Sequence, residues 1–90
     1  MATAVASEMD ILRRIVDPEQ PSLPAEAAHA ILRFGFSGKD RTRMNRLAAK
    51  NRKGNLNEVE EKELNSFIRV GQILGILQSK ARRSLEELDK

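Results

Sequence analysis

The chain has 90 residues, of which 32% are charged and only 3% are aromatic, and its formal net charge is +3. A chain of this length forms one domain at most and buries only about 60% of the surface that its unfolded form exposes. The absence of cysteine excludes disulfides and thiolate metal sites, and no stretch approaches the ~20 apolar residues of a transmembrane helix. With no signal-peptide pattern at the N-terminus either, we expect a cytoplasmic protein whose small core needs a partner or self-association.

The first predicted element is a short helix between Ser7 and Asp17. Ser7 is a good N-terminal cap, and apolar residues follow it at helical spacing. Three prolines within the next seven residues predict an extended linker. We therefore expect residues 1–21 to be a flexible segment with one short helix, attached to a helical domain over residues 22–90.

Ser22 is the predicted cap of a second, alanine-rich helix, with Pro24 in its first turn and Gly35 as its C-terminal stop. The single histidine, His29, has no second His or Cys at ligand spacing, so we predict an ordinary packed or surface histidine. The glycines and lysine at 35–39 lack the spacing of a phosphate-binding loop. The sequence therefore predicts no catalytic residue, no metal ion and no cofactor.

The third predicted helix runs over residues 38–52 after the cap Ser37, and Gly54 ends it. Between residues 39 and 53 there are seven basic side chains and one acidic side chain. The basic residues are Lys39, Arg41, Arg43, Arg46, Lys50, Arg52 and Lys53. They could contact phosphate backbones, although no aromatic residue among them could stack on bases.

The other interpretation of these basic residues is a solvated face that is partly paired with glutamates across a hairpin. The glutamates are Glu58, Glu60, Glu61 and Glu63. Because exposed ion pairs contribute little, we favour this interpretation, or a protein contact, over a nucleic-acid site.

The fourth predicted helix begins after Asn57, has an acidic first turn that suits the helix dipole, and continues to the C-terminal end. We expect this helix, over residues 57–88, to form an antiparallel hairpin with the helix over residues 38–53. Residues 22–34 should pack across the hairpin. The fold class is therefore all-α, a small domain built on this hairpin and its long C-terminal helix. From Val70 to Leu77 nearly the whole circumference is apolar, which predicts burial on more than one side, against the domain and against a partner.

Gly71 and Gly75 form a Gly-x-x-x-Gly pair within this apolar stretch, although each glycine costs a helix ~1 kcal/mol relative to alanine. One interpretation is the close approach of another helix, across a dimer axis or from a partner. The alternatives are a close contact within the chain and a kink. The predicted interface residues are Phe67, Arg69, Val70, Gly71, Ile73, Leu74, Gly75, Leu77, Ser79, Lys80 and Arg82.

Two runs of the sequence resemble a group of small bacterial helical proteins. Residues 43–47 and 54–56 match the pattern R-M-x-x-L followed by G-x-L. Residues 63–71 and 77–82 match E-L-x-x-F/Y-x-R-V-G and L-x-S-K-A-R, so that the resemblance covers about residues 25–85. Genes of this group often lie beside one for an HNH-type endonuclease, which implies an antitoxin-like or accessory partner of a nuclease.

Our leading hypothesis is a non-enzymatic interaction protein, a homodimer or the small partner of a nuclease, that binds through the apolar face of its long helix. The first alternative is a nucleic-acid-binding module that uses the basic helix at 39–53. The second is a structural or assembly component, which would need the same apolar face. No membrane and no small-molecule substrate is implied.

Overall fold

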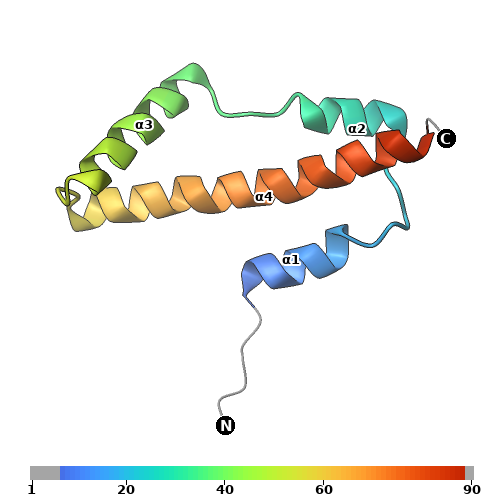
Figure 1. Cartoon of the computed structure of the whole chain (residues 1–90), viewed down its shortest axis with the longest axis horizontal. Coiled ribbons are helices and arrows are strands. Elements are labelled where there is room, and N and C mark those ends of the chain that lie inside the picture. Colours follow the sequence, from blue (N-terminus) through green and yellow to red (C-terminus); the bar gives the residue numbers. More distant parts are fainter. Residues whose placement is uncertain (1–6, 89–90) are drawn as a thin grey trace, which may run out of the picture. The chain divides into compact units, whose positions relative to one another are not determined.

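The computed structural model describes residues 7–88, in which every regular element is a helix (Figure 1). The helices are α1 (Glu8–Val16), α2 (Ala25–Leu32), α3 (Gly38–Arg52) and α4 (Glu58–Leu88). The all-α prediction with a long C-terminal helix is therefore confirmed. The part of the flexible-segment prediction that concerns residues 1–6 lies outside the described residues.

Three of the predicted N-terminal caps are confirmed. The Ser7 hydroxyl accepts from the backbone N–H of Asp10 at 3.1 Å, and the Asp10 carboxylate accepts from the N–H of Ser7 at 3.1 Å, which lowers the pKa of that carboxyl. Ser37 accepts from the N–H three residues later at 3.1 Å. Asn57 and Glu60 exchange side chain-to-backbone bonds of 2.8 and 3.2 Å at the start of α4. Each cap satisfies donors that a helix start leaves free.

The predicted cap of the second helix is wrong. Helix α2 begins at Ala25, and Pro24 occupies the cap position in an extended conformation, without a side-chain hydrogen bond. A proline restricts the residue before it to extended conformations, so Leu23 cannot continue a turn that begins at Ser22. The N–H of Leu23 is instead bound by Ser84 of α4.

The turn between α3 and α4 forms as predicted around Gly54. This residue has φ +71°, a left-handed conformation that glycine adopts without strain. The N–H groups of Gly54 and Asn55 donate to the carbonyls of Asn51 and Lys50, both at 3.0 Å. This is the Schellman pattern, which satisfies the last carbonyls of α3 and ends the helix.

The described residues form two compact units that share α4. Unit 1 contains residues 7–34 with residues 72–88, and unit 2 contains Gly35–Gly71. Helix α4 therefore contributes its N-terminal half to unit 2 and its C-terminal half to unit 1.

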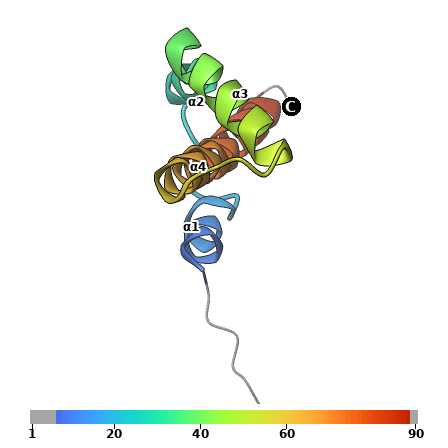
Figure 2. The same cartoon turned by 90° about the vertical axis from the view of Figure 1, so that its left-hand side faces the viewer.

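In unit 1, α1 and α2 lie on opposite sides of the C-terminal half of α4 (Figures 1 and 2). The buried apolar residues of this unit are Ala28 of α2 and Ile76 and Ala81 of α4; both alanines have no exposed surface. Alanine at a contact allows neighbouring helix axes to approach closely, because helix separation depends on the side chains between them. The core of unit 1 is therefore narrow.

In unit 2, α3 and the N-terminal half of α4 form the predicted antiparallel hairpin (Figure 1). Leu47 of α3 is its one fully buried large side chain among the described residues. The rings of Phe36 and Phe67 meet edge to face, with centroids 6.0 Å apart. Such a pair contributes about 0.5–1.5 kcal/mol beyond the area it buries, which is a useful addition to so small a core.

Candidate functional site

Lys80 is part of the internal structure of unit 1. Only 7% of the residue is exposed, and its ammonium group donates to the backbone carbonyls of Pro18 and, at 3.2 Å, Glu19. Burying an ammonium group is unfavourable unless its donors are satisfied, so these carbonyls are the reason it can lie there. The sequence had placed Lys80 on the partner interface, but in this structure its charged end is committed to the proline linker.

Two neighbours of Lys80 on α4 hold the same linker. The hydroxyl of Ser84 accepts from the N–H of Leu23 at 2.9 Å, and Arg83 lies 3.5 Å from the carboxylate of Asp17. Lys80, Arg83 and Ser84 are spaced i, i+3 and i+4, so they emerge from adjacent turns of α4. We call these three residues the linker clamp. Sequence spacing could have suggested that they share a face, but not that a segment about 60 residues earlier in the chain would be their partner.

Gln78 has a comparable role at the C-terminal end of α2. Its side-chain amide donates to the carbonyls of Ile31 at 3.2 Å and of Phe34 at 2.8 Å. The Ile31 carbonyl also accepts from the N–H of Phe34 at 3.1 Å, so the amide adds a second donor there and connects the end of α2 and the residues after it to α4. These bonds give a structural role to the polar residue that directly follows the apolar stretch from Val70 to Leu77.

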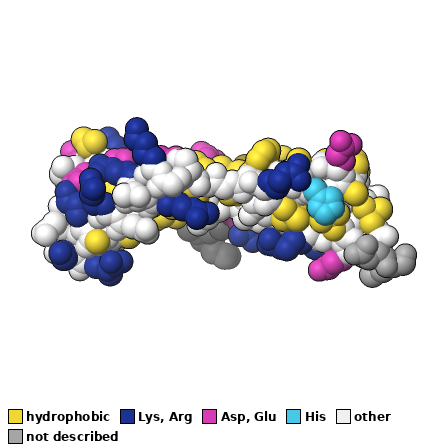
Figure 3. All heavy atoms as spheres, turned by 90° about the horizontal axis from the view of Figure 1, so that it is seen from above, with side chains coloured by type: hydrophobic (Ala, Val, Ile, Leu, Met, Phe, Trp, Pro, Cys, Tyr) yellow, Lys and Arg dark blue, Asp and Glu magenta, His cyan; other side chains and the backbone are white. Residues whose placement is uncertain are grey.

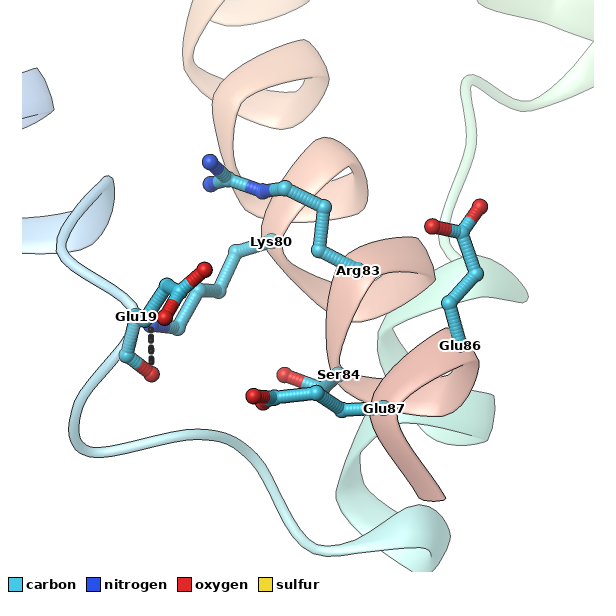
Figure 4. A pocket seen from close by; sticks show the side chains of 6 residues that line it. All are labelled: Glu19, Lys80, Arg83, Ser84, Glu86 and Glu87. Atoms are coloured by element: carbon cyan, nitrogen blue, oxygen red, sulfur yellow. Dashed lines mark hydrogen bonds between the residues drawn. The ribbon is translucent and has the colours of Figure 1, made fainter. Parts of the chain in front are cut away.

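A hollow of about 250 Å³ opens beside the linker clamp, and Figure 4 shows the side chains around it. It is lined by Glu19, Lys80, Arg83, Ser84, Glu86 and Glu87. Three carboxylates and two cations share the lining, so neither sign of charge dominates. Because the ammonium of Lys80 already binds backbone carbonyls, the arrangement favours no particular class of ligand.

The predicted interface residues do not lie together on one face of α4. A helix turns about 100° per residue, so eleven residues between 67 and 82 surround its axis. Phe67 packs on Phe36 in unit 2, and a Cβ atom added to Gly71 would lie 3.9 Å from the same ring. In unit 1, half-buried residues are Ile73, Leu74 and Leu77.

The exposed members of the predicted interface fall into two groups. In unit 2, Arg69 is exposed and Val70 has half of its surface exposed. In unit 1, the spacing of Gly75, Ser79 and Arg82 places them on one face of α4; Ser79 is partly covered and the other two are exposed. An apolar contact surface is therefore best supported at Val70, and a small-residue surface at Gly75.

The two glycines of the Gly-x-x-x-Gly pair are not required by packing inside their own units. A Cβ atom at Gly71 would make an ordinary van der Waals contact with Phe36, and one at Gly75 would meet no atom within 4 Å. The interpretation of a close contact within the chain is therefore not supported at Gly75. An external helix and a kink remain the interpretations that would explain a glycine there.

The basic helix α3 pairs with two of the predicted glutamates. Arg43 donates to Glu63 through two bonds of 2.9 and 2.8 Å, which raises the pKa of Arg43 and lowers that of Glu63. Lys50 donates to Glu60. This bond and, to a smaller extent, the bond from the N–H of Asn57 lower the pKa of Glu60. The predicted pairing across the hairpin is confirmed at these two positions.

The other predicted glutamates, Glu58 and Glu61, are exposed and form no ion pair with any residue between 7 and 88. The remaining basic residues between 39 and 53 likewise have no acidic partner in that range. They are Lys39, Arg41, Arg46, Arg52 and Lys53. In Figure 3, basic side chains gather over the left-hand part of the molecule, where Figure 1 places α3.

A second hollow, of about 410 Å³, lies on α3. It is lined by Lys39, Thr42, Arg43 and Arg46, with no acidic residue among them. The spacing i, i+3, i+4 and i+7 places all four on one face of the helix. Unlike the hollow in unit 1, this one has a single sign of charge.

His29 is exposed on α2, so of the two predicted alternatives, a packed or a surface histidine, the second is found. Among the described residues, no group of three or more His, Asp or Glu side chains converges as a metal site would require. None of the described helices combines the length and apolar character needed to cross a membrane.

Comparison of the chain with models of protein families, with curated proteins and with solved structures finds no match.

Proposed function

We propose that this chain is a non-enzymatic protein-binding module, a cytoplasmic bacterial protein that acts as a homodimer or as the small partner of a nuclease. The observation that supports it is the balance between buried and exposed apolar side chains. Among the described residues only Ala28, Leu47, Ile76 and Ala81 form the buried apolar core. Seven large apolar side chains are exposed, namely Ile11, Ile15, Phe34, Val59, Ile68, Val70 and Leu88.

This balance favours association on energetic grounds. Fully burying a Val, Leu, Ile or Phe side chain contributes about 1.5–3 kcal/mol, and domains of this size have little stability to spare. A partner that covers part of the exposed set would therefore stabilise the chain as well as bind it. Single exposed apolar residues are ordinary on protein surfaces. Association is favoured here because the buried core is small compared with the apolar surface that stays exposed.

The face of α4 that carries Val59 and Val70 is the best-supported contact in unit 2. The two residues are three helical turns apart on one side of the helix, with 75% and 50% of their surfaces exposed. Glu63 and Ser66 lie between them on the same side, and the Glu63 carboxylate is paired with Arg43. A partner surface along this face would therefore meet one paired carboxylate beside the apolar side chains.

The resemblance to proteins encoded beside an HNH-type endonuclease supports a nuclease as the partner. The chain is basic, however, whereas an inhibitor that imitates DNA would be acidic. A nuclease partner would therefore be bound through the apolar face of α4, and the antitoxin-like role would work by covering a protein surface.

Affinity purification of the tagged chain from its native host, with mass spectrometry of the proteins that accompany it, tests this proposal. Val70→Asp should abolish recovery of the partner because it places a carboxylate in the contact. Asn65→Asp makes the same charge change at an exposed position on another side of α4 and should have no effect. Retention of the partner by Val70→Asp would contradict the proposal.

The identity of what is recovered separates the variants of the proposal. A stoichiometric nuclease would support the accessory role. A second copy of the chain alone would support a homodimer or an assembly component. If neither a protein partner nor a second copy of the chain is recovered at any concentration, a protein-binding function is rejected.

A further inference from the structure

The hollow on α3 has properties that the proposed protein contact does not use. Its four lining residues are Lys39, Thr42, Arg43 and Arg46. The side chains come from one helix, carry three positive charges and include no carboxylate. From these observations we infer that unit 2 binds the phosphate backbone of a nucleic acid along this face of α3.

The charge of the chain is concentrated in this unit. Residues 35–71 contain nine Lys or Arg and five Asp or Glu, so their net charge of +4 exceeds the +3 of the whole chain. The described residues of unit 1 contain six basic and seven acidic side chains. A basic surface confined to one unit attracts a polyanion to that unit and not to the chain in general.

Arg43 has a fixed orientation in the hollow. Its Nε and one terminal nitrogen donate to Glu63, which leaves the second terminal nitrogen directed elsewhere, and the side chain is 36% exposed. An arginine has five N–H donors in a planar fork, so a carboxylate on one edge leaves donors for an anion on another. Glu63 thus orients Arg43 but also cancels much of its charge.

Lys39 and Arg46 supply the unpaired charge on either side of Arg43. Neither forms an ion pair with residues 7–88, and they lie seven residues apart, about 10 Å along the helix axis. Phosphates of one strand succeed each other about every 3.4 Å along a duplex axis, so this distance spans about three phosphate-to-phosphate steps. The positions of the two basic residues therefore suit successive phosphates of one strand.

The chemistry of the hollow also predicts how the nucleic acid is bound. No aromatic residue occurs between 37 and 66, so the bases have no stacking surface there. The Thr42 hydroxyl already donates to the carbonyl of Gly38 at 3.0 Å. Contacts from Lys and Arg to phosphates hold a protein on its nucleic acid but carry no sequence information, so binding should be insensitive to sequence.

The decisive experiment measures affinity as a function of salt for the full chain, by fluorescence anisotropy with a labelled mixed-sequence DNA duplex. The double variant Lys39→Gln/Arg46→Gln removes the two unpaired charges of the hollow. The matched control Arg41→Gln/Arg52→Gln removes two charges from the other side of α3, where both residues are exposed and unpaired within residues 7–88. Circular dichroism checks that both variants keep their helices.

We expect the slope of log Kobs against log salt concentration to fall by about two for the hollow variant, since each phosphate contact contributes about 0.9. The control should change it by much less than one. Equal losses in the two variants would mean that only net charge matters, and would overturn the site. No binding of the duplex, or of its single strand, at low salt would overturn the proposal altogether.

A second comparison uses a gain of affinity. Glu63→Gln releases Arg43 and should strengthen binding more than Glu61→Gln, which makes the same charge change at an exposed, unpaired glutamate. Equal strengthening would contradict the role of Arg43. If polyglutamate bound as tightly as the duplex, with the same dependence on Lys39 and Arg46, an acidic protein would be the ligand and the nucleic-acid proposal would be rejected.

Discussion

The two units of this chain share one helix but are stabilised by different interactions. Unit 1 is connected by hydrogen bonds between α4 side chains and backbone groups 44 to 62 residues earlier in the sequence. Unit 2 is connected by two ion pairs between residues only 10 and 20 positions apart. Contacts between near neighbours close short loops, so the hairpin of unit 2 should form with less loss of chain entropy than unit 1.

The difference also bears on what each unit is free to do. Two charged residues of α4 in unit 1, Lys80 and Arg83, hold the linker, and Glu86 and Glu87 lie beside them, so the surface there has mixed charge. The basic residues of unit 2 exceed the glutamates available to them, so its surface carries an excess of positive charge. Basic residues of α4 hold the linker in unit 1, whereas five of the basic residues between 39 and 53 form no ion pair with residues 7–88, which is why we propose a ligand for unit 2 and not for unit 1.

The largest expected effect comes from Leu47→Ala, which removes the fully buried side chain of unit 2. Large-to-small changes at such sites cost about 2–5 kcal/mol of unfolding free energy. Urea denaturation followed by far-ultraviolet circular dichroism measures this loss. Val59→Ala, at a position that is 75% exposed, is the control and should change little. Similar effects from the two substitutions would show that unit 2 has no real core.

Lys80→Met tests the linker clamp of unit 1. The variant keeps the length of the side chain but loses the donor to the carbonyls of Pro18 and Glu19, and should lose about 2–3 kcal/mol. Limited proteolysis should cut faster between residues 17 and 23. Arg82→Met removes the same charge from an exposed position of α4 and should not. Equal cleavage of the two variants would show that the linker is not held by Lys80.

Acid should weaken unit 2 through its paired glutamates. The pKa values of Glu60 and Glu63 are lowered below the ordinary 4.5 by Lys50 and Arg43, so the folded state binds protons less readily than the unfolded state. Their contribution is therefore complete above about pH 4.5 and is lost as the pH falls through the lowered values.

A comparison of two double variants checks this dependence. In Glu60→Gln/Glu63→Gln the loss of stability with acid should be shallower than in the wild type, as measured by urea denaturation at a series of pH values. Glu58→Gln/Glu61→Gln should retain the wild-type dependence. If the unfolding free energy of both variants falls with acid as steeply as that of the wild type, the ion pairs do not contribute to the pH dependence. Asp10 of α1, whose pKa is lowered by Ser7, should leave a residual dependence in unit 1.

The smallest expected effect has the opposite sign. Gly75→Ala should stabilise the free chain by about 1 kcal/mol, because alanine favours helix and the added Cβ meets no atom within 4 Å. Gly54→Ala should destabilise it by about 1–2 kcal/mol, because φ there is +71°. Thermal unfolding measures both. If Gly75→Ala stabilises the chain but weakens binding of its partner, the partner lies on the face of α4 that carries Gly75. Unchanged binding would mean that the partner does not contact this face.

The proximity of interacting residues in the sequence decides how much of the structure could be predicted. The caps Ser7, Ser37 and Asn57 act on N–H groups within three residues, so local spacing was sufficient to predict where α1, α3 and α4 begin. Gly54 ended α3 as expected, because its conformation depends mainly on its own lack of a side chain. Ser22 failed as a cap because Pro24 restricts the residue between them.

The helices, the basic character of α3 and the hairpin turn could be predicted from the sequence, since each depends on neighbours along the chain. The sequence did not reveal that Lys80, Arg83 and Ser84 hold the proline linker, that Gln78 binds the end of α2, or that Arg43 and Lys50 pair with Glu63 and Glu60. These contacts join residues 10 to 66 positions apart. At such separations helical spacing says which side chains share a face, but the packing of another segment decides what that face meets.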